Sequence, residues 1–357
     1  MNRYILFGTY TQTSPDGPHR SQGVYIYQMD PNSGELNYVS SVDGVQNPSF
    51  LDVHPTHRFL YTVNEFDQGR VSAVAIGPNL RSFTFLNSQS TGGSAPCYLS
   101  LDPAGKWLFV ANYGSGSLAV FPILPDGSLG PASDFVQHQG SSANKIRQTS
   151  PFAHSILFDP TGRFVLAADL GIDRVLVYRL DESAGRLHPH DPSGMSTHPG
   201  AGPRHLVFHP NQRFLYVSNE LDSTVTACSW DSGKGSLKPI QALSTLPPGF
   251  SGENGVADIR ITPSGSYLYV SNRGHNSLAI YAVNSQDGTL TPNGIVSTLG
   301  NWPRNFAIDP SGAFLYAANQ FSDTVVTFRV DGNTGQLIPT GQVTSVPSPV
   351  CVKIVDL

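Results

Sequence analysis

The sequence predicts an all-β fold, and composition and residue pattern both support this. Its 357 residues include 35 glycines and 28 prolines, and only 13% of the residues are charged. No stretch combines sustained helical periodicity with good helix-forming residues, whereas short apolar or alternating runs recur between turn residues. Strands joined by turns therefore describe this chain better than helices do.

An internal repeat defines the architecture within that class. Six segments share a Pro-containing turn followed by an apolar strand that ends in Asn or Asp, as in "HPTHRFLYTVN" and "HPNQRFLYVSN". The last residues of the six segments are Asn64, Asn112, Asp169, Asn219, Asn272 and Asn319. They follow one another at intervals of 47 to 57 residues, close to the length of a four-stranded propeller blade. The repeat predicts a β-propeller and excludes a helical solenoid.

Each repeat continues with the two further strands that a blade needs. A third alternating strand such as "SLAVFPI" or "RVLVYRL" leads to a Gly-x-Leu turn and a fourth strand. The turn glycines are Gly127, Gly185, Gly235, Gly288 and Gly335. Residues 70–90 contain no Gly-x-Leu, so we expect a different hairpin in that unit.

The two ends of the chain complete one more unit. The opening "RYILFGTYT" aligns with "RFLYTVNEF" at Arg58 and is followed by its own third and fourth strands, but no first strand precedes it. The C-terminal "SPVCVKIVDL" parallels the first strand "NPSFLDVHP". We therefore expect a single domain, residues 1–357, with seven blades of four antiparallel strands. One blade would be closed by about residues 1–45 together with 348–357, which leaves no open sheet edge.

Charge and cysteine content limit the partners and the compartment. The net charge of −5 and the absence of Lys/Arg runs argue against binding to nucleic acid or to an anionic membrane surface. The N-terminus shows no signal-peptide pattern, and no apolar run is long enough to span a membrane. Cys97, Cys228 and Cys351 are too few and too far apart for a disulfide framework or a CxxC metal site. We expect a cytoplasmic, reduced protein with a small-molecule partner.

The blade register gathers charged residues at one face of the ring. Residues six positions before each turn proline begin the first strand of a blade: Ser49, Cys97, His154, Arg204, Ala257 and Arg304. Residues just after each terminal Asn or Asp follow the second strand: Glu65, Tyr113, Leu170, Glu220, Arg273 and Gln320. In an up-and-down blade, the start of the first strand and the end of the second strand lie on the same face. We therefore expect His154, Arg204, Glu220, Arg273, Arg304 and Gln320 to meet at one mouth of the central channel. His205, Asp258 and Arg260 alternate with these positions and are weaker candidates.

Two interpretations of this cluster stay open. Glu220 and Arg204 alone could form a structural ion pair. Three arginines, a histidine and a glutamate converging from different blades favour a ligand site. The polar segment 138–150, "HQGSSANKIRQTS", either folds over the mouth, where Lys145 and Arg147 would attract anions, or remains a solvated loop. One histidine and one glutamate among arginines suit no metal, and no cofactor or nucleophile-elbow motif is present.

At these residues the chain resembles a known family. The segments "GTYT", "GAGPRHLVFHP", "LYVSNEL", "SNRG" and "WPRNF" occur in the order found in seven-bladed lactonase propellers, which include bacterial 6-phosphogluconolactonase and fungal carboxy-cis,cis-muconate cyclase. The resemblance covers essentially the whole chain. It implies a catalytic set of His154, Arg204, Glu220 and Arg273, and Arg304 and Gln320 match further positions of the family's channel mouth. We expect substrate-binding positions at Arg304, Gln320, His205 and Glu65. The family often has Pro-His-x-His where this chain has "PFAH", so Phe152 replaces the first histidine and His154 is the only one left.

These residue types suit the hydrolysis of an anionic lactone without a cofactor. Arginines bind phosphate or carboxylate and stabilise the oxyanion that ring opening produces. Either Glu220 or His154 could take a proton from the attacking water, while the other orients the water or protonates the leaving alkoxide; our hypothesis makes Glu220 the general base and His154 the acid. Three arginines suit a phosphate or two carboxylates alike, so the residues do not specify the lactone. The resemblance implies a carboxylic ester hydrolase acting on 6-phosphogluconolactone, and we expect this activity. The alternatives are a muconate-lactonising cyclase using the same residues without water, and a noncatalytic binding propeller, whose mouth would expose aromatic and apolar side chains.

Overall fold

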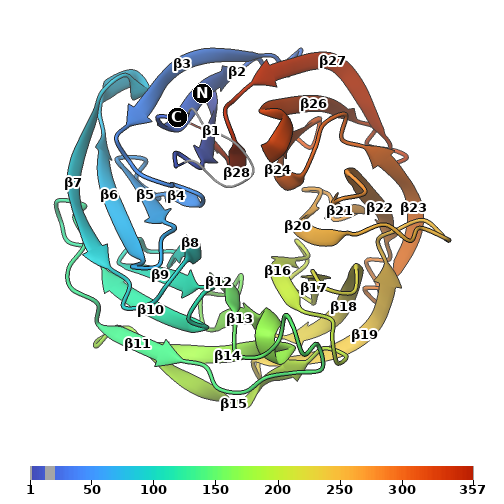
Figure 1. Ribbon diagram of the computed structural model, residues 1–357, viewed down its shortest axis with the longest axis horizontal. Helices are drawn as coiled ribbons and strands as arrows, with labels where there is room; N and C mark the ends of the chain where they lie inside the picture. Colours follow the sequence, from blue (N-terminus) through green and yellow to red (C-terminus); the bar gives the residue numbers. More distant parts are fainter. Residues whose placement is uncertain (1, 13–20, 357) are drawn as a thin grey trace.

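Seven four-stranded antiparallel sheets form a closed ring in the computed structural model, which describes residues 2–12 and 21–356 (Figure 1). The predicted all-β, seven-bladed propeller is confirmed. Apart from strands, the described residues contain three short 3-10 turns, η1 (Pro78–Leu80), η2 (Leu170–Ile172) and η3 (Gln320–Ser322). Nothing in the described part of the chain is a helix long and apolar enough to cross a membrane.

Six of the blades are continuous in sequence, and their first strands lie nearest the central axis. From the axis outward, the strands of these blades are β4 (Leu51–Val53), β5 (Phe59–Asn64), β6 (Arg70–Ile76) and β7 (Phe83–Ser90); β8 (Pro96–Leu101), β9 (Trp107–Asn112), β10 (Ser117–Pro122) and β11 (Asp134–Gln137); β12 (Ala153–Phe158), β13 (Val165–Asp169), β14 (Arg174–Asp181) and β15 (Arg186–Ser196); β16 (Pro203–Phe208), β17 (Phe214–Asn219), β18 (Thr224–Asp231) and β19 (Ser236–Ser244); β20 (Gly255–Ile261), β21 (Tyr267–Arg273), β22 (Ser277–Val283) and β23 (Leu290–Ser297); β24 (Pro303–Ile308), β25 (Phe314–Asn319), β26 (Thr324–Val330) and β27 (Leu337–Ser345).

The seventh blade is built from both ends of the chain, as the sequence predicts. Its order is β28 (Pro349–Asp356), β1 (Arg3–Thr9), β2 (Gly23–Met29) and β3 (Leu36–Asp43). β28 pairs with β1 along its length, and the two termini lie close together in Figure 1. The Arg3 guanidinium donates from Nε to Asp356 Oδ1 at 2.7 Å and from Nη1 to Asp309 Oδ2, also at 2.7 Å, in the neighbouring blade. Through these two ion pairs, Arg3 of β1 connects the closing strand β28 with the neighbouring blade.

The apolar core lies between neighbouring blades, where the repeat residues meet. The second strands are almost wholly buried. Four of their tyrosines, Tyr61, Tyr216, Tyr269 and Tyr316, each donate to a glycine carbonyl in the outer turn of the neighbouring blade. Tyr216 Oη, for example, lies 3.2 Å from Gly288 O. Gly288 has a φ of +77°, and a Cβ there would lie 2.4 Å from Phe214, so only glycine fits. The unit without a Gly-x-Leu turn uses η1 in its hairpin instead.

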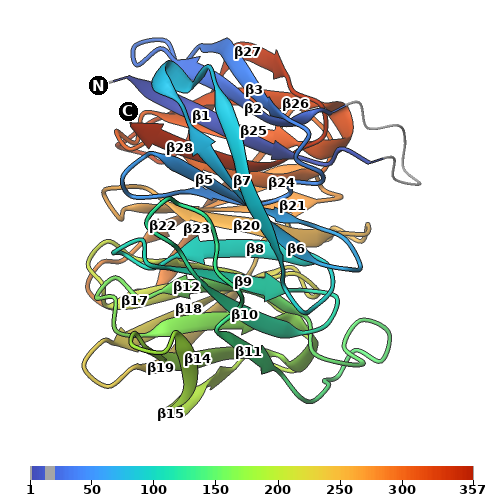
Figure 2. The ribbon, with the colours of Figure 1, turned by 90° about the vertical axis from the view of Figure 1, so that its left-hand side faces the viewer.

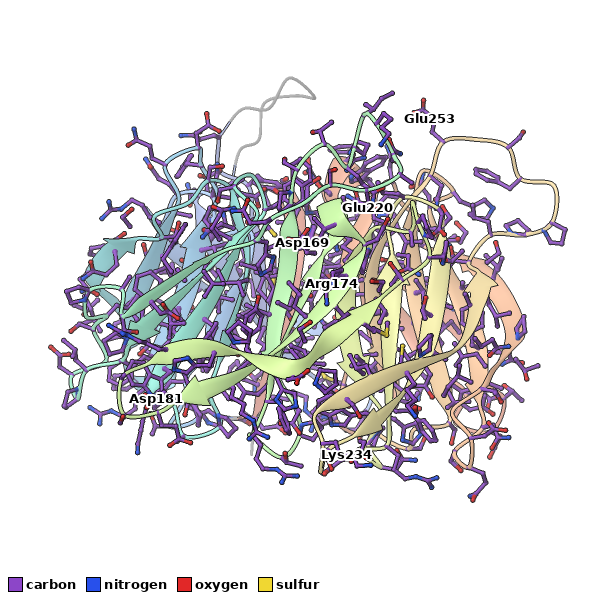
Figure 3. The ribbon with its side chains drawn as sticks, turned by 90° about the horizontal axis from the view of Figure 1, so that it is seen from below. Asp169, Arg174, Asp181, Glu220, Lys234 and Glu253 are labelled. Atoms are coloured by element: carbon purple, nitrogen blue, oxygen red, sulfur yellow. The ribbon has the colours of Figure 1, made fainter. Side chains whose placement is uncertain are left out.

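Irregular pairing at the start of the first strands determines which residues face the mouth of the ring. In β12, β16 and β24 the register shifts by one residue, so His154, Arg204 and Arg304 are each an extra residue without a partner in the neighbouring strand. Such bulges redirect side chains. Figure 2 shows the ring edge-on with loops at its two faces, and Figure 3 places Glu220 toward one face while Asp181 and Lys234 lie toward the other.

Candidate active site

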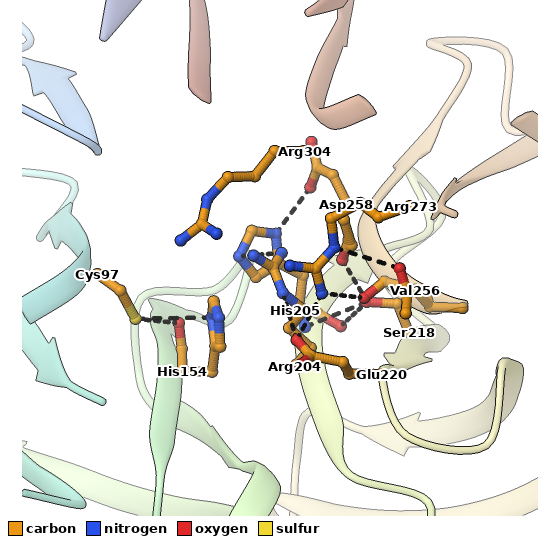
Figure 4. A network of polar contacts seen from close by, with 12 residues as sticks. Cys97, His154, Arg204, His205, Ser218, Glu220, Val256, Asp258, Arg273 and Arg304 are labelled. Carbon is orange, nitrogen blue, oxygen red and sulfur yellow. Dashed lines mark hydrogen bonds and ion pairs between the residues drawn. The ribbon is translucent and has the colours of Figure 1, made fainter. Parts of the chain in front are cut away.

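The carboxylate of Glu220 is the centre of the predicted cluster. It follows β17 and is only 7% exposed. Its Oε2 accepts from Arg204 Nε at 3.0 Å and lies 2.8 Å from Arg273 Nη2 (Figure 4). Its Oε1 accepts from Arg147 Nη2 at 2.9 Å. These arginines come from β16, from β21 and from the loop between β11 and β12. The register therefore brings Glu220, Arg204 and Arg273 together as expected.

The three arginines fix the charge of Glu220. Burial on its own raises the pKa of this carboxyl, but Arg273, Arg204 and Arg147 outweigh it and lower the pKa to about 2. Burial, together with Arg273, lowers the pKa of Arg204 to about 10. Both groups are therefore ionised at neutral pH, and the cluster carries net positive charge.

His154 lies in the same cluster as a neutral imidazole. It is 5% exposed, and its Nδ1 lies 3.6 Å from Cys97 Sγ. Burial lowers its pKa well below 6.5, and the positive charges of Arg204 and its neighbours lower it further. Nε2 makes no hydrogen bond to any residue that the structure describes. His154 thus has an uncommitted ring nitrogen beside the arginines.

Arg304 and Glu65 form a second, looser pair. Arg304 Nη2 lies 3.9 Å from Glu65 Oε1, and Glu65 Oε2 accepts from Tyr10 Oη at 2.8 Å. The Arg304 guanidinium also lies over the Tyr10 ring, 5.5 Å from its centroid. The predicted substrate-binding residues Arg304 and Glu65 are therefore neighbours, on different blades from Glu220.

The other two predicted substrate-binding residues are placed differently. His205 is 4% exposed, and both of its ring nitrogens have protein partners, Arg204 Nη1 at 3.2 Å and Asp258 Oδ1 at 2.8 Å. Gln320 is 7% exposed, and its Oε1 is buried without a hydrogen-bond partner among the described residues. Its backbone nitrogen donates to Trp302 O at 3.0 Å.

Arg147 is the functional candidate that sequence reasoning left undecided. Besides Glu220, its Nη2 donates to Tyr113 Oη at 3.1 Å, so this part of loop 138–150 folds over the cluster. Lys145 instead donates to Ser142 O within the loop. This loop has no repeating pattern, so the sequence could not predict where Arg147 would lie.

Asp173 holds this loop in place. Its Oδ1 accepts from Gln148 Nε2 and from the Gly202 backbone nitrogen, each at 2.7 Å. Its Oδ2 accepts from Ser142 Oγ at 2.5 Å and from the Gly200 backbone nitrogen at 2.7 Å. One buried carboxylate therefore ties the Arg147 loop to the segment that leads into Arg204.

A cleft opens beside these residues. Its volume is about 780 Å³, and Arg147, Glu220, Arg273 and Trp302 line it. The Arg273 guanidinium lies 5.5 Å from the centroid of the Trp302 ring, which gives the cleft one aromatic wall. This volume suits a small ligand. Within residues 2–12 and 21–356, no three His, Cys, Asp or Glu side chains are grouped so as to hold a metal ion.

Known proteins match this chain over nearly its full length. A family model described as "Lactonase, 7-bladed beta-propeller" matches residues 4–354. The 6-phosphogluconolactonase of Bacillus subtilis (strain 168) is 36% identical over 355 residues, covering 99% of each chain. The 6-phosphogluconolactonase of Formosa agariphila is 35% identical over 311 residues, covering 85% of this chain and 86% of that one. The structure of the periplasmic gluconolactonase PpgL of Pseudomonas aeruginosa superimposes with a TM-score of 0.92 at 35% identity, covering 100% of this chain and 99% of the other.

Proposed function

Because the chain belongs to the seven-bladed β-propeller lactonase family, we propose that it hydrolyses a small anionic sugar lactone, 6-phosphogluconolactone, to 6-phosphogluconate. The observation that carries this proposal is the Glu220 carboxylate held by three arginines beside the neutral His154. No metal or cofactor is needed for the steps described below.

The arginines of the cleft account for binding of the anionic substrate. Arg147 and Arg273 line the cleft wall, and a guanidinium group can bind a phosphate through two parallel hydrogen bonds. Gln320 is not among the residues that line this cleft, and its Oε1 is buried and unpartnered within the described residues, so its contact with the substrate stays a prediction. Arg304 and Glu65 supply a second pair of groups of opposite charge for the substrate's polar substituents.

Arg204 and Arg273 account for transition-state stabilisation. Attack of water on the lactone carbonyl carbon places negative charge on the carbonyl oxygen. A buried guanidinium that is already oriented stabilises this charge without reorganising. Arg204 is 2% exposed and bonded through Nε and Nη1, which leaves its Nη2 for the oxyanion.

The charge states of His154 and Glu220 at neutral pH revise the roles in proton transfer that we expected from the sequence. At neutral pH His154 is a neutral imidazole rather than an imidazolium, since its pKa lies well below 6.5, so it is suited to accept a proton and not to act as the first acid. We therefore assign it to take the proton from the attacking water and to return it to the ring oxygen when the carbon–oxygen bond breaks. Glu220, with its pKa at about 2, stays a carboxylate that orients the arginines and the water.

Hydrolysis is favoured over the other functions that the residues allow. A cycloisomerase would use the same arginines, but the relatives named above are lactonases. A binding platform would present mainly apolar side chains at the mouth, whereas four charged side chains, Arg147, Glu220, Glu253 and Arg273, line the cleft beside Trp302 and Leu221.

We also propose that the protein acts in the cytoplasm. All three cysteines are buried free thiols, which suits a reducing compartment. The relative PpgL is named as periplasmic, so cell fractionation with antibody detection is the appropriate test. Recovery with periplasmic markers would contradict this location.

The activity is tested by the rate of acid release from freshly generated 6-phosphogluconolactone, with and without protein, against spontaneous hydrolysis. Gluconolactone and a muconolactone serve as comparison substrates, and Glu220→Gln as the control variant. We expect acceleration with the phosphorylated lactone that is strongly reduced in the variant. Acceleration of none of the sugar lactones would overturn the proposal and direct attention to the muconolactone.

A further inference from the structure

His205 lies directly beneath the active-site arginine and is closed off from the cleft. It is packed between the rings of Tyr98 and His154, whose centroids each lie 5.2 Å from its own. Both of its ring nitrogens are within hydrogen-bond distance of protein groups, Arg204 on one side and Asp258 on the other (Figure 4). A side chain so enclosed acts through its neighbours rather than on a ligand.

The partners determine which nitrogen carries the proton. A guanidinium group can only donate hydrogen bonds, so Nε2 of His205, 3.2 Å from Arg204 Nη1, must be the acceptor. The proton of the neutral ring therefore sits on Nδ1 and is donated to Asp258 Oδ1 at 2.8 Å. The imidazole is held in one tautomer with its lone pair aimed at Arg204.

Asp258 is itself fixed by groups on two blades. It is 1% exposed. Its Oδ2 accepts from Asn305 Nδ2 at 2.8 Å and from Arg260 Nε at 3.0 Å. The carboxylate therefore cannot turn away from His205 without breaking several bonds.

We propose that Asp258 and His205 are positioning residues for hydrolysis, which lock the Arg204 guanidinium in the orientation that stabilises the oxyanion. The chain of bonds runs from Asp258 through His205 Nδ1 and Nε2 to Arg204 Nη1, while Glu220 holds Nε of the same group. Two fixed bonds on one planar guanidinium define its plane and direct Nη2. This inference rests on the proposed lactonase activity and assigns His205 a role other than substrate binding.

The test compares two replacements of His205. In His205→Gln, the amide can donate to Asp258 and accept from Arg204, so it preserves the polarity of the link. In His205→Phe, an aromatic ring remains, but it has no nitrogen to bond Asp258 or Arg204. We expect kcat of His205→Phe to fall on the order of 10²-fold with a smaller change in KM, since misorientation of a catalytic group has effects of this size. His205→Gln should recover at least about tenfold of that loss.

His209→Phe is the matched control, because His209 is also a buried histidine, directly after β16, and its Nε2 donates to Gly265 O at 3.1 Å, outside the link to Arg204. It should lower the thermal unfolding midpoint without the loss of kcat seen for His205→Phe. If the two variants lose kcat equally, or if folded His205→Phe keeps wild-type kcat, the positioning role is wrong.

A second readout uses the wild-type protein and needs no activity. Nitrogen-15 NMR of the histidine rings distinguishes the two neutral tautomers, and we expect His205 to carry its proton on Nδ1. A proton on Nε2 would overturn the inference even if His205→Phe failed to fold. An inactive wild-type protein with the expected tautomer would instead contradict the proposed function alone.

Discussion

The β-bulges at the first strands decide which side chains reach the active site. Regular alternation makes His205 a weak candidate, because neighbours in a strand point to opposite faces. At the bulge, however, Arg204 is an extra residue, and Arg204 and His205 contact each other. The count of six residues before the turn proline located Arg204 correctly. The bulge that directs it leaves no signal in residue type, so the contact with His205 could not be predicted.

Replacing His154 tests the proton transfer. His154→Gln keeps a polar side chain of similar size but cannot exchange a proton, so kcat should fall roughly 10²- to 10⁴-fold. For the wild type, kcat/KM should be independent of pH at and above 6.5 and fall only at pH values well below 6.5, because protonated His154 cannot act as a base. The pH profile is measured by lactone hydrolysis after subtraction of the spontaneous rate. Retention of wild-type kcat in His154→Gln would assign the base to Glu220.

The two buried histidines also predict how stability depends on pH. Burial, and then Arg204, lower the pKa of His205 to about 4, and the pKa of His154 is lowered in the same direction. The unfolded chain therefore binds more protons, so this stability is complete above pH 6.5 and is lost as the pH falls toward 4. The loss should be up to about 1.4 kcal/mol per pH unit for each histidine.

Urea unfolding at pH 7 and pH 5 measures this effect. His205→Gln should show a smaller pH dependence than the wild type, because it lacks one of the two titrating groups. Equal dependence in both proteins would mean that His205 does not carry a lowered pKa.

At the scale of elements, the loop between β11 and β12 is what the sequence leaves least defined. Its polar residues allow either a solvated loop or a cover for the site. The structure shows that Arg147 reaches Glu220 and that Asp173 anchors the loop. Such an anchor depends on four donors brought together from distant segments, so local sequence pattern could not reveal it.

Replacing the anchor should uncouple Arg147 from the site. An Asn at position 173 offers one acceptor oxygen where the carboxylate serves four donors, so Asp173→Asn should raise KM and make loop 138–150 sensitive to proteolysis. Asp323 has the same left-handed backbone conformation after η3, and its Oδ1 accepts from the Ser348 backbone nitrogen. Asp323→Asn is therefore the control, in which the β11–β12 loop should keep its protease resistance. Equal resistance in both variants would mean that Asp173 does not anchor the loop.

The architecture of the whole molecule was predictable because repetition is a long-range signal. Six copies of one pattern specified strand order, and the unmatched segments at the two ends specified the split blade. The clustering of Glu220, Arg204 and Arg273 followed from the same register. The pairing of Arg304 with Glu65, while Glu220 pairs with Arg204 and Arg273, did not follow from it, because such pairing depends on how side chains of different blades pack across the axis.

Ring closure should depend on β28. Removing residues 348–357 exposes the edge of β1 and deletes the Arg3–Asp356 ion pair. We expect the truncated protein to aggregate or to unfold at a markedly lower temperature, as measured by size-exclusion chromatography and calorimetry. A synthetic peptide of residues 348–357 should restore part of the stability when added. An unchanged unfolding midpoint without the peptide would show that the split blade does not hold the ring together.

The start of the first strand gives each blade one comparable place at the mouth, and not all of these places are used for chemistry. Ala257 carries only a methyl group there, and the Ser49 hydroxyl is bonded to Glu65. New side chains at these two places could be selected for a different lactone while the strands behind them stay unaltered. The blades could therefore keep their fold while substrate preference changes through single positions at the mouth.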